Sequence, residues 1–101
     1  MASYRLSRLA EADLREISAA TITNWGSIQA RAYLESLDKT MLALADNPNL
    51  GRERAEIYGG ARSFPCGKHI IFYRTAAKDI IEIARVLHQR MDVLGQFNDE
   101  F

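Results

Sequence analysis

Two long stretches of the chain repeat apolar residues at three- and four-residue steps, the spacing of one face of an α-helix. The first runs from Arg8 to about Asn24, and its stripe is Ala10, Leu14, Ile17, Thr21 and, just beyond, Trp25. Ser7 is a natural N-cap, because its hydroxyl can accept a hydrogen bond from an unpaired amide of the first turn. Gly26 can adopt the left-handed conformation that ends a helix. We expect Trp25 to pack as a wedge between two helices.

The second helical stretch runs from Ser27, a possible N-cap, to about Asp46. Its stripe is Ala30, Leu34, Leu37, Met41 and Leu44, widened by Tyr33. Pro48 has no amide hydrogen to continue the helical hydrogen bonds, so the helix should end just before it. Because only one or two residues separate the two stretches, the pattern predicts an antiparallel helical hairpin.

Four shorter stretches are candidate strands, and the last two of them are rich in the β-branched and aromatic residues that favour strands. They are residues 3–6, 61–65 and 68–74, and the apolar run that starts at Asp79 and ends at His88. Cys66-Gly67 and residues 75–78 are the expected turns between the last three strands, which would form an antiparallel meander. The charged, glycine-punctuated segment from Leu50 to Gly60 is typical of a solvated loop.

The chain turns polar after His88, and residues 89–94 predict a short helical piece before Gly95. The tail carries two aromatic residues, Phe97 and Phe101, which we expect to be exposed. The order of elements predicts a single α+β domain over residues 1–101. It consists of an N-terminal strand, an antiparallel helical hairpin packed on a small, mainly antiparallel sheet, and a short C-terminal helical segment.

Composition narrows the classes of function. The 101 residues are 48% apolar and 26% charged, which is ordinary for one soluble domain. Thirteen basic and thirteen acidic residues cancel, so we expect no direct sequence-specific binding of nucleic acid. Cys66 is the single cysteine, which favours a reducing compartment. No stretch approaches the ~20 apolar residues of a membrane span, and the N-terminus lacks a signal-peptide core. We therefore expect a cytoplasmic protein without a membrane partner.

The residues with useful reactivity are Cys66, His69 and His88. A hairpin that turns around Ala77-Lys78 would place His69 opposite Val86, with His88 one pair further along on the same face and Cys66 on the opposite face. With Arg90 nearby, two imidazoles could perform general acid–base cleavage of RNA. Structural histidines and a protein-binding patch are the competing readings, because no carboxylate is clearly placed to orient either ring. Three scattered ligands at most make a metal site the weakest reading, so we expect no metal and no cofactor.

The chain resembles the ParE toxins of bacterial toxin–antitoxin modules, within the RelE/ParE superfamily, over nearly its whole length. The resemblance rests on Tyr4-Arg5-Leu6-Ser7, Ala10, Asp13-Leu14, Trp25-Gly26, Ala30, Tyr33, Asn47-Pro48 and Gly51-Arg52 in family-like order. It is sharpest at Gly67-x-His69-Ile70-Ile71-Phe72-Tyr73-Arg74 and at Ile83-x-Arg85-Val86-Leu87-His88-Gln89-x-Met91-Asp92.

The resemblance implies a helical hairpin against a curved sheet. It also implies a hetero-oligomer with a cognate ParD-like antitoxin, whose C-terminal region folds as it wraps the toxin's helices and sheet edge. The implied target is DNA gyrase, which ParE-like toxins inhibit by binding rather than by catalysis, so that replication fails. On this reading the chain is not an enzyme.

The RelE-like branch of the superfamily supplies an alternative, ribosome-dependent cleavage of mRNA. There, arginines in the third strand and at the end of the last strand assist cleavage, together with a tyrosine in the terminal segment. Those positions hold His69, His88 and Leu94 here, so the alternative site is His69, His88 and Arg90. The leucine and the zero net charge argue against it.

The residues expected to bind the target follow the last strand. They are His88, Arg90, Met91, Asp92, Leu94 and Phe97. For the antitoxin, we expect contacts at the strand edge near Arg62 and Phe64. The identity of the antitoxin and the stoichiometry of the complex do not follow from the sequence.

Overall fold

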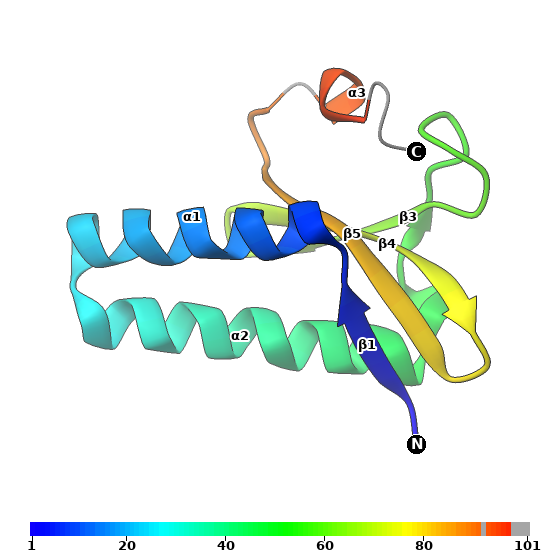
Figure 1. Ribbon diagram of the computed structural model, residues 1–101, viewed down its shortest axis with the longest axis horizontal. Helices are drawn as coiled ribbons and strands as arrows, with labels where there is room; N and C mark the ends of the chain where they lie inside the picture. The colour runs from blue at the N-terminus through cyan, green and yellow to red at the C-terminus, as the bar shows by residue number, and fades with distance from the viewer. Residues whose placement is uncertain (92, 98–101) are drawn as a thin grey trace.

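Two long helices lie against one face of a five-stranded sheet in the computed structural model, which describes residues 1–91 and 93–97 (Figure 1). The strands are β1 (Ser3–Leu6), β2 (Arg52–Glu53), β3 (Arg62–Cys66), β4 (His69–Ala77) and β5 (Ile80–His88). The helices are α1 (Arg8–Trp25), α2 (Ser27–Asp46), a 3₁₀ turn η1 (Pro48–Leu50) and α3 (Val93–Gln96). The α+β class and the helical hairpin are confirmed. No helix in the described part of the chain combines the length and apolar character needed to cross a membrane.

The N-cap of α1 is the predicted one. The Ser7 hydroxyl accepts a hydrogen bond from the Ala10 amide at 3.0 Å and donates to the Ala84 carbonyl at 2.7 Å, so the cap also ties α1 to β5. Gly26 adopts a φ of 90°, as expected for a glycine between two helices. The predicted capping by Ser27 is wrong. With a single connecting residue, Gly26 itself is the N-cap, because its carbonyl accepts the first helical hydrogen bond, from Ala30, and Ser27 is already helical.

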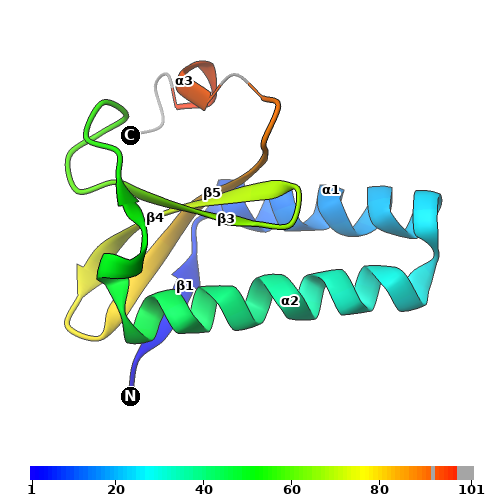
Figure 2. The same ribbon diagram turned by 180° about the vertical axis from the view of Figure 1, so that it is seen from behind.

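Trp25 does not pack between the helices. The residue is 69% exposed, and the prediction of a wedge is wrong. Figures 1 and 2 show the reason: the turn of the hairpin extends well beyond the edge of the sheet, where no second layer covers it. Ile22 and Ile28, near the same turn, are also exposed. The tip of the hairpin is therefore an apolar surface.

The sheet has the order β1-β5-β4-β3-β2 and is larger than the predicted three-stranded meander. β1 pairs in parallel with β5, from Ser3 opposite Ile80, and all other pairs are antiparallel. β2 lies within the segment expected to be a solvated loop and pairs with Arg62 and Ser63 of β3. The expectation of a mainly antiparallel sheet is confirmed.

The β4–β5 hairpin is longer than predicted, because residues 75–77 continue the strand. The turn is Lys78-Asp79, where Asp79 has a φ of 62°. His69 therefore pairs directly with His88 and not with Val86. The shift from position 86 to position 88 is two residues, and an even shift leaves each side chain on its predicted face. The shared face of the two histidines is confirmed, and they lie closer than expected.

Cys66 lies on the same face of the sheet as His69, contrary to prediction. It is the last residue of β3 and pairs with His69, so the turn is Gly67-Lys68. Directly paired residues of neighbouring strands share a face. The Cys66 thiol accordingly faces α2, with its Sγ 3.3 Å from Thr40 Oγ1.

Each face of the sheet has its own core. The helix-side core joins α1 and α2 to residues of the sheet such as Ile71, Tyr73 and Ile83. The outer core joins Phe72 and Leu87 to Ile57, Tyr58, Val93 and Phe97. α3 lies on this outer side, away from α2 (Figure 1).

Phe97 is only 5% exposed and stacks edge-on against Phe72, with ring centroids 5.3 Å apart. The prediction that its ring is exposed is wrong, because α3 folds back over the sheet. Phe101 and Asp92 lie outside the described residues. The helix itself begins at Val93, four residues later than predicted, after a turn in which Met91 donates its amide hydrogen to the His88 carbonyl at 3.0 Å.

Candidate partner-binding groove

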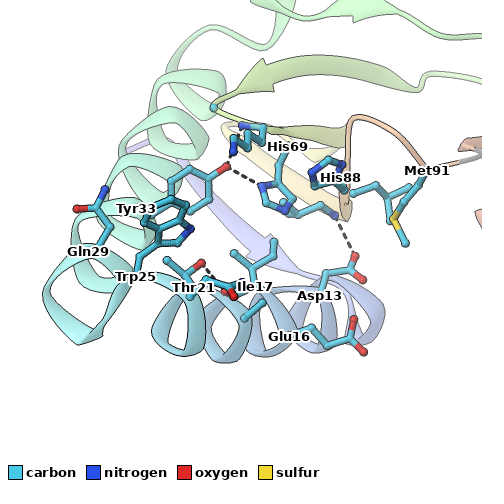
Figure 3. A pocket seen from close by; sticks show the side chains of 16 residues that line it. Asp13, Glu16, Ile17, Thr21, Trp25, Gln29, Tyr33, His69, His88 and Met91 are labelled. Carbon is cyan, nitrogen blue, oxygen red and sulfur yellow. Dashed lines mark hydrogen bonds between the residues drawn. The ribbon is translucent and has the colours of Figure 1, made fainter.

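An open groove of about 680 Å³ runs between the helical hairpin and the ends of β4 and β5 (Figure 3). Its outer part is lined by apolar side chains of α1 and of the segment after β5, among them Ile17, Ala20, Trp25 and Met91. Trp25 is exposed and Met91 is 44% exposed, so both offer apolar surface to a molecule that binds in the groove. Exposed tryptophan and methionine are more frequent at protein interfaces than elsewhere on a protein surface.

The inner end of the groove is polar and contains both histidines. The rings of His69 and His88 meet edge to face, with centroids 5.4 Å apart and an interplanar angle of 78°. Tyr33 of α2 lies beside them, its hydroxyl oxygen 2.6 Å from His69 Nδ1. The same hydroxyl accepts the Lys68 amide hydrogen at 3.1 Å and lies 3.3 Å from the Cys66 carbonyl oxygen. Tyr33 thus anchors the β3–β4 turn to the helical hairpin.

Gly67 is required at this turn for two reasons. Its φ of 60° is a conformation that L-residues rarely adopt, and a Cβ there would lie 2.7 Å from atoms of the Tyr33 ring. The absence of a side chain at Gly67 lets Tyr33 reach His69.

The electrostatics of the groove keep His69 uncharged at neutral pH. Burial lowers the pKa of His69 below its usual value, and the neighbouring His88 lowers it further. The Asp13 carboxylate acts in the opposite direction but does not cancel these effects. Burial also raises the pKa of Tyr33, so its hydroxyl remains protonated and available for hydrogen bonds.

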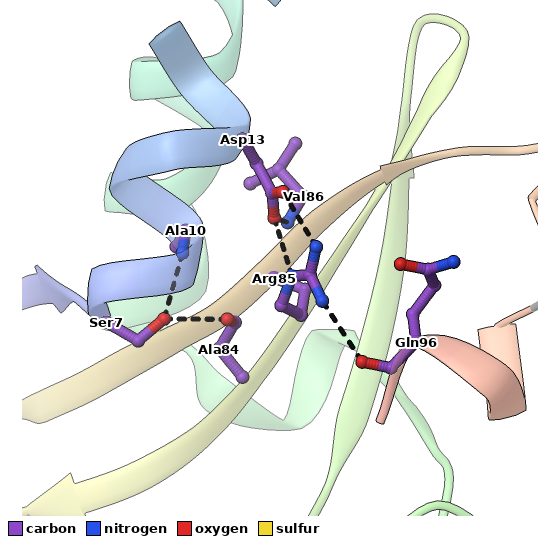
Figure 4. A network of polar contacts seen from close by, with 7 residues as sticks. All are labelled: Ser7, Ala10, Asp13, Ala84, Arg85, Val86 and Gln96. Carbon is purple, nitrogen blue, oxygen red and sulfur yellow. Dashed lines mark hydrogen bonds and ion pairs between the residues drawn. The ribbon is translucent and has the colours of Figure 1, made fainter. Parts of the chain in front are cut away.

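Asp13 is held by a network under the groove (Figure 4). Its two carboxylate oxygens accept hydrogen bonds from Arg85 Nε and Nη2 at 2.8 and 2.9 Å, and one of them also accepts the Val86 amide hydrogen at 3.0 Å. Arg85 Nη1 donates to the Gln96 carbonyl at 3.0 Å, which ties α3 to the sheet. Asp13 is therefore engaged in structure, and no hydrogen bond joins it to either histidine.

Three of the predicted target-binding residues lie together. His88 and Met91 line the groove, and the Arg90 amide donates to His88 Nδ1 at 3.2 Å while its side chain is exposed. Leu94 belongs to α3, which lies on the outer side of the sheet. Phe97 is in the outer core, away from the groove. Asp92 lies outside the described residues.

The predicted antitoxin-binding residues lie away from the groove, on β3. Arg62 donates to the Gly51 carbonyl at 2.7 Å, and Phe64 packs partly buried against the helix-side core. Sequence reasoning assigned Ile17, Tyr33 and Trp25 to the core-facing stripes of the helices. Ile17 is buried in the helix-side core and Tyr33 packs against that core, but both also line the groove, and Trp25 is exposed there. The available signal was a tryptophan next to a one-residue helix connection, at the point of the hairpin farthest from the sheet.

Solved structures place this fold in a known structural class. The chain matches a chain of a structure titled "Chromosomal ParDE TA system from P. aeruginosa" with a TM-score of 0.73, covering 87% of this chain and 96% of that one at 23% identity. At that identity the likeness concerns the fold alone.

Sequence comparisons define the family. Residues 4–93 match the model of the family described as "ParE toxin of type II toxin-antitoxin system, parDE". Toxin ParE1 of Mycobacterium tuberculosis is 44% identical over 90 residues, which cover 89% of this chain and 92% of the relative. Toxin ParE1 of Caulobacter vibrioides is 39% identical over 92 residues, 91% of this chain and 94% of the relative. Toxin ParE of Escherichia coli is 31% identical over 99 residues, covering 98% and 96%. The chain belongs to the ParE toxin family of type II toxin–antitoxin systems.

Proposed function

We propose that this ParE-family toxin acts by binding DNA gyrase and blocking replication, and that a ParD-like antitoxin neutralises it in the cytoplasm by binding the same chain. The observation that carries the proposal is family membership over residues 4–93 combined with an open, partly apolar groove between hairpin and sheet. A toxin that is inhibited by a folding partner needs such a surface, because a disordered segment gains its binding energy by burying apolar side chains.

The groove is the proposed main contact for the antitoxin. An amphipathic segment could place apolar side chains against Trp25 and Ile17 and polar ones near Lys68 and His69 at the inner end. The strand edge at β3 is the proposed second contact. β2 pairs only with Arg62 and Ser63, so the backbone from Phe64 onward has no strand neighbour on that side among the described residues. An extended segment could add to the sheet there.

The target-binding surface is proposed at the end of β5 and the segment after it: His88, Arg90 and Met91, together with Asp92 and Leu94. Inhibition by binding fits the chemistry of the groove. His69 Nδ1 is hydrogen-bonded to Tyr33, and the Asp13 carboxylate is bound to Arg85, so no carboxylate of the described residues orients either imidazole. Phe97 would contribute indirectly, because its buried ring holds α3 on the sheet.

A supercoiling assay tests the proposal. Purified chain added to DNA gyrase, ATP and relaxed plasmid should block supercoiling and cause cleaved DNA to accumulate, and added antitoxin should reverse both effects. Arg90→Ala should weaken inhibition, whereas Lys39→Ala, at an exposed basic position on α2, should not. Normal supercoiling in stoichiometric excess of the wild-type chain would reject gyrase as the target.

The pairing of two histidines in an open groove favours one second candidate, cleavage of mRNA on the ribosome by His69, His88 and Arg90. Two facing imidazoles can act as general base and general acid. In that case the wild-type chain should cut mRNA in a translating extract, and His88→Ala should abolish cutting while the fold survives. Intact mRNA with the wild-type chain would exclude this candidate.

A further inference from the structure

His69 and His88 are the two histidines of the chain, and they occupy directly paired positions of β4 and β5. Both side chains line the inner end of the groove (Figure 3), and both residues are partly exposed. Two imidazoles held on neighbouring strands are preorganised, because the backbone hydrogen bonds of the hairpin limit how far they can separate.

The separation of the rings suits a shared metal ion. For a metal–nitrogen bond of about 2.0–2.1 Å, the centroid of an imidazole ring lies about 3.2 Å from the metal. Two such rings at a tetrahedral angle have centroids about 5.2 Å apart. The observed separation is 5.4 Å. The edge-to-face arrangement of the rings is also compatible, because each ring can rotate about its own bond to the metal.

On both rings the hydrogen-bonded nitrogen is Nδ1, which leaves Nε2 as the nitrogen for a metal ion. His69 Nδ1 faces the Tyr33 hydroxyl at 2.6 Å, and His88 Nδ1 accepts the Arg90 amide hydrogen at 3.2 Å. No hydrogen bond from the described residues reaches either Nε2 atom. With its proton on Nδ1, His69 donates to Tyr33, which in turn donates to the Cys66 carbonyl. A metal-binding histidine is usually oriented by such a bond through its second nitrogen. His88 accepts at Nδ1 and so carries its proton on Nε2 in the metal-free chain. Metal binding at Nε2 would move this proton to Nδ1 and break the 3.2 Å hydrogen bond from the Arg90 amide.

We propose that His69 and His88 form a two-histidine binding site for a divalent transition metal ion such as Zn²⁺ or Ni²⁺ at the inner end of the groove. Imidazole nitrogen is a preferred ligand of both ions. No group of three or more histidine, cysteine, aspartate or glutamate side chains gathers among residues 1–91 and 93–97, so the chain supplies two ligands and water completes the coordination. A bound ion would cross-link β4 to β5 and occupy the polar end of the groove.

Calorimetric titration of the tag-free chain with ZnCl₂ and with NiCl₂ tests the site. Saturable binding of one ion per chain is expected, with no binding of Mg²⁺, which prefers oxygen ligands. His69→Ala, His88→Ala and the double variant should each bind at least about tenfold more weakly and by similar amounts, because a chelate needs both rings. Gln89→Ala, an exposed neighbour of His88, should bind like the wild type.

Three results would overturn the site. They are an absence of saturable binding up to about 1 mM metal, unchanged binding in either histidine variant, or additive losses that indicate two independent imidazoles. A second measurement does not depend on the variants. Ni²⁺ added to the ¹⁵N-labelled wild-type chain should broaden amide signals around residues 67–70 and 87–89 before all others. Broadening centred elsewhere would reject the site.

Discussion

Asp13 on α1 and Arg85 on β5, which are 72 residues apart in the sequence, form a bidentate ion pair with nitrogen–oxygen distances of 2.8 and 2.9 Å. Both side chains are about nine-tenths buried, at 10% and 11% exposure. Arg85 also donates to the Gln96 carbonyl, so this one contact connects the helical hairpin, the sheet and the C-terminal helix (Figure 4). The groove depends on this connection, because α1 and β5 are two of its walls.

Removing the carboxylate of this pair should destabilise the fold strongly. Asp13→Ala leaves the Arg85 guanidinium buried without its charged partner, which costs about 3–5 kcal/mol in comparable cases. Urea unfolding followed by circular dichroism measures the change. Glu11→Ala is the matched control, because Glu11 lies on the same helix and pairs with Arg15 at an exposed 4.0 Å contact worth about 0.5 kcal/mol or less. Equal losses in the two variants would show that the buried pair has no special role.

Gly67→Ala tests the turn that holds Tyr33 against His69. An alanine would have to adopt a φ of 60° and would place its Cβ 2.7 Å from the Tyr33 ring. We expect a loss of about 1–3 kcal/mol in the free energy of unfolding, together with a shift of the His69 imidazole signals in NMR spectra. Gly59→Ala is the control, because nothing lies within 4 Å of a Cβ at that position. A neutral Gly67→Ala would mean that the turn relaxes without cost.

Tyr4 gives the fold a dependence on alkaline pH. Its hydroxyl donates to Asp38 at 2.6 Å and joins β1 to α2. Burial raises the pKa of Tyr4 to about 12, and the hydrogen bond to Asp38 and its negative charge act in the same direction. Because the folded pKa lies above the usual 10.0, the contribution to stability is complete below pH 10 and is lost as the pH rises towards 12.

Tyr4→Phe isolates this contribution from those of the other tyrosines. The difference in unfolding free energy between wild type and Tyr4→Phe should be constant below pH 10 and should shrink between pH 10 and 12. Urea unfolding across this range measures it. A difference that does not change with pH would show that Tyr4 ionises equally easily in the folded and unfolded chain.

The sequence predicted local features well where a single element determines them. Ser7 caps α1 and Gly26 ends it, because both effects act within a few residues of the backbone. The two histidines share a face because the alternation of a strand survives an even shift of register. Their direct pairing could not be predicted, because it depends on the position of the turn. The turn lies at Lys78-Asp79, where Asp79 adopts a positive φ of 62°.

Tertiary contacts decided the features that were predicted wrongly. Phe97 looks like part of a tail but is buried, because Arg85 and Phe72 bring α3 back onto the outer face of the sheet. Cys66 lies on the face opposite to the predicted one, because it pairs directly with His69 across the β3–β4 hairpin and therefore shares its face. Trp25 continues the apolar stripe of α1, but the stripe extends beyond the edge of the sheet, so the sheet does not cover Trp25 there.

Trp25 offers the sharpest test of the groove, because its role in binding can be separated from any role in folding. Because Trp25 is 69% exposed, Trp25→Ala should change the unfolding free energy by less than about 1 kcal/mol. If the antitoxin binds in the groove, the same change should weaken the complex by about 2 kcal/mol or more, roughly 30-fold in Kd. Calorimetry with the purified antitoxin measures the affinity.

Ile28→Ala is the matched control. Ile28 is an apolar residue of the same hairpin tip, 87% exposed, but it does not line the groove. If the groove provides the contact, replacing Ile28 should leave the affinity for the antitoxin unchanged. Nonspecific hydrophobic contact with the hairpin tip would instead be weakened by this replacement. Equal weakening by both variants would show that the antitoxin binds the outside of the hairpin and not the groove. Unchanged affinity in both variants would show that the tip of the hairpin is not part of the interface.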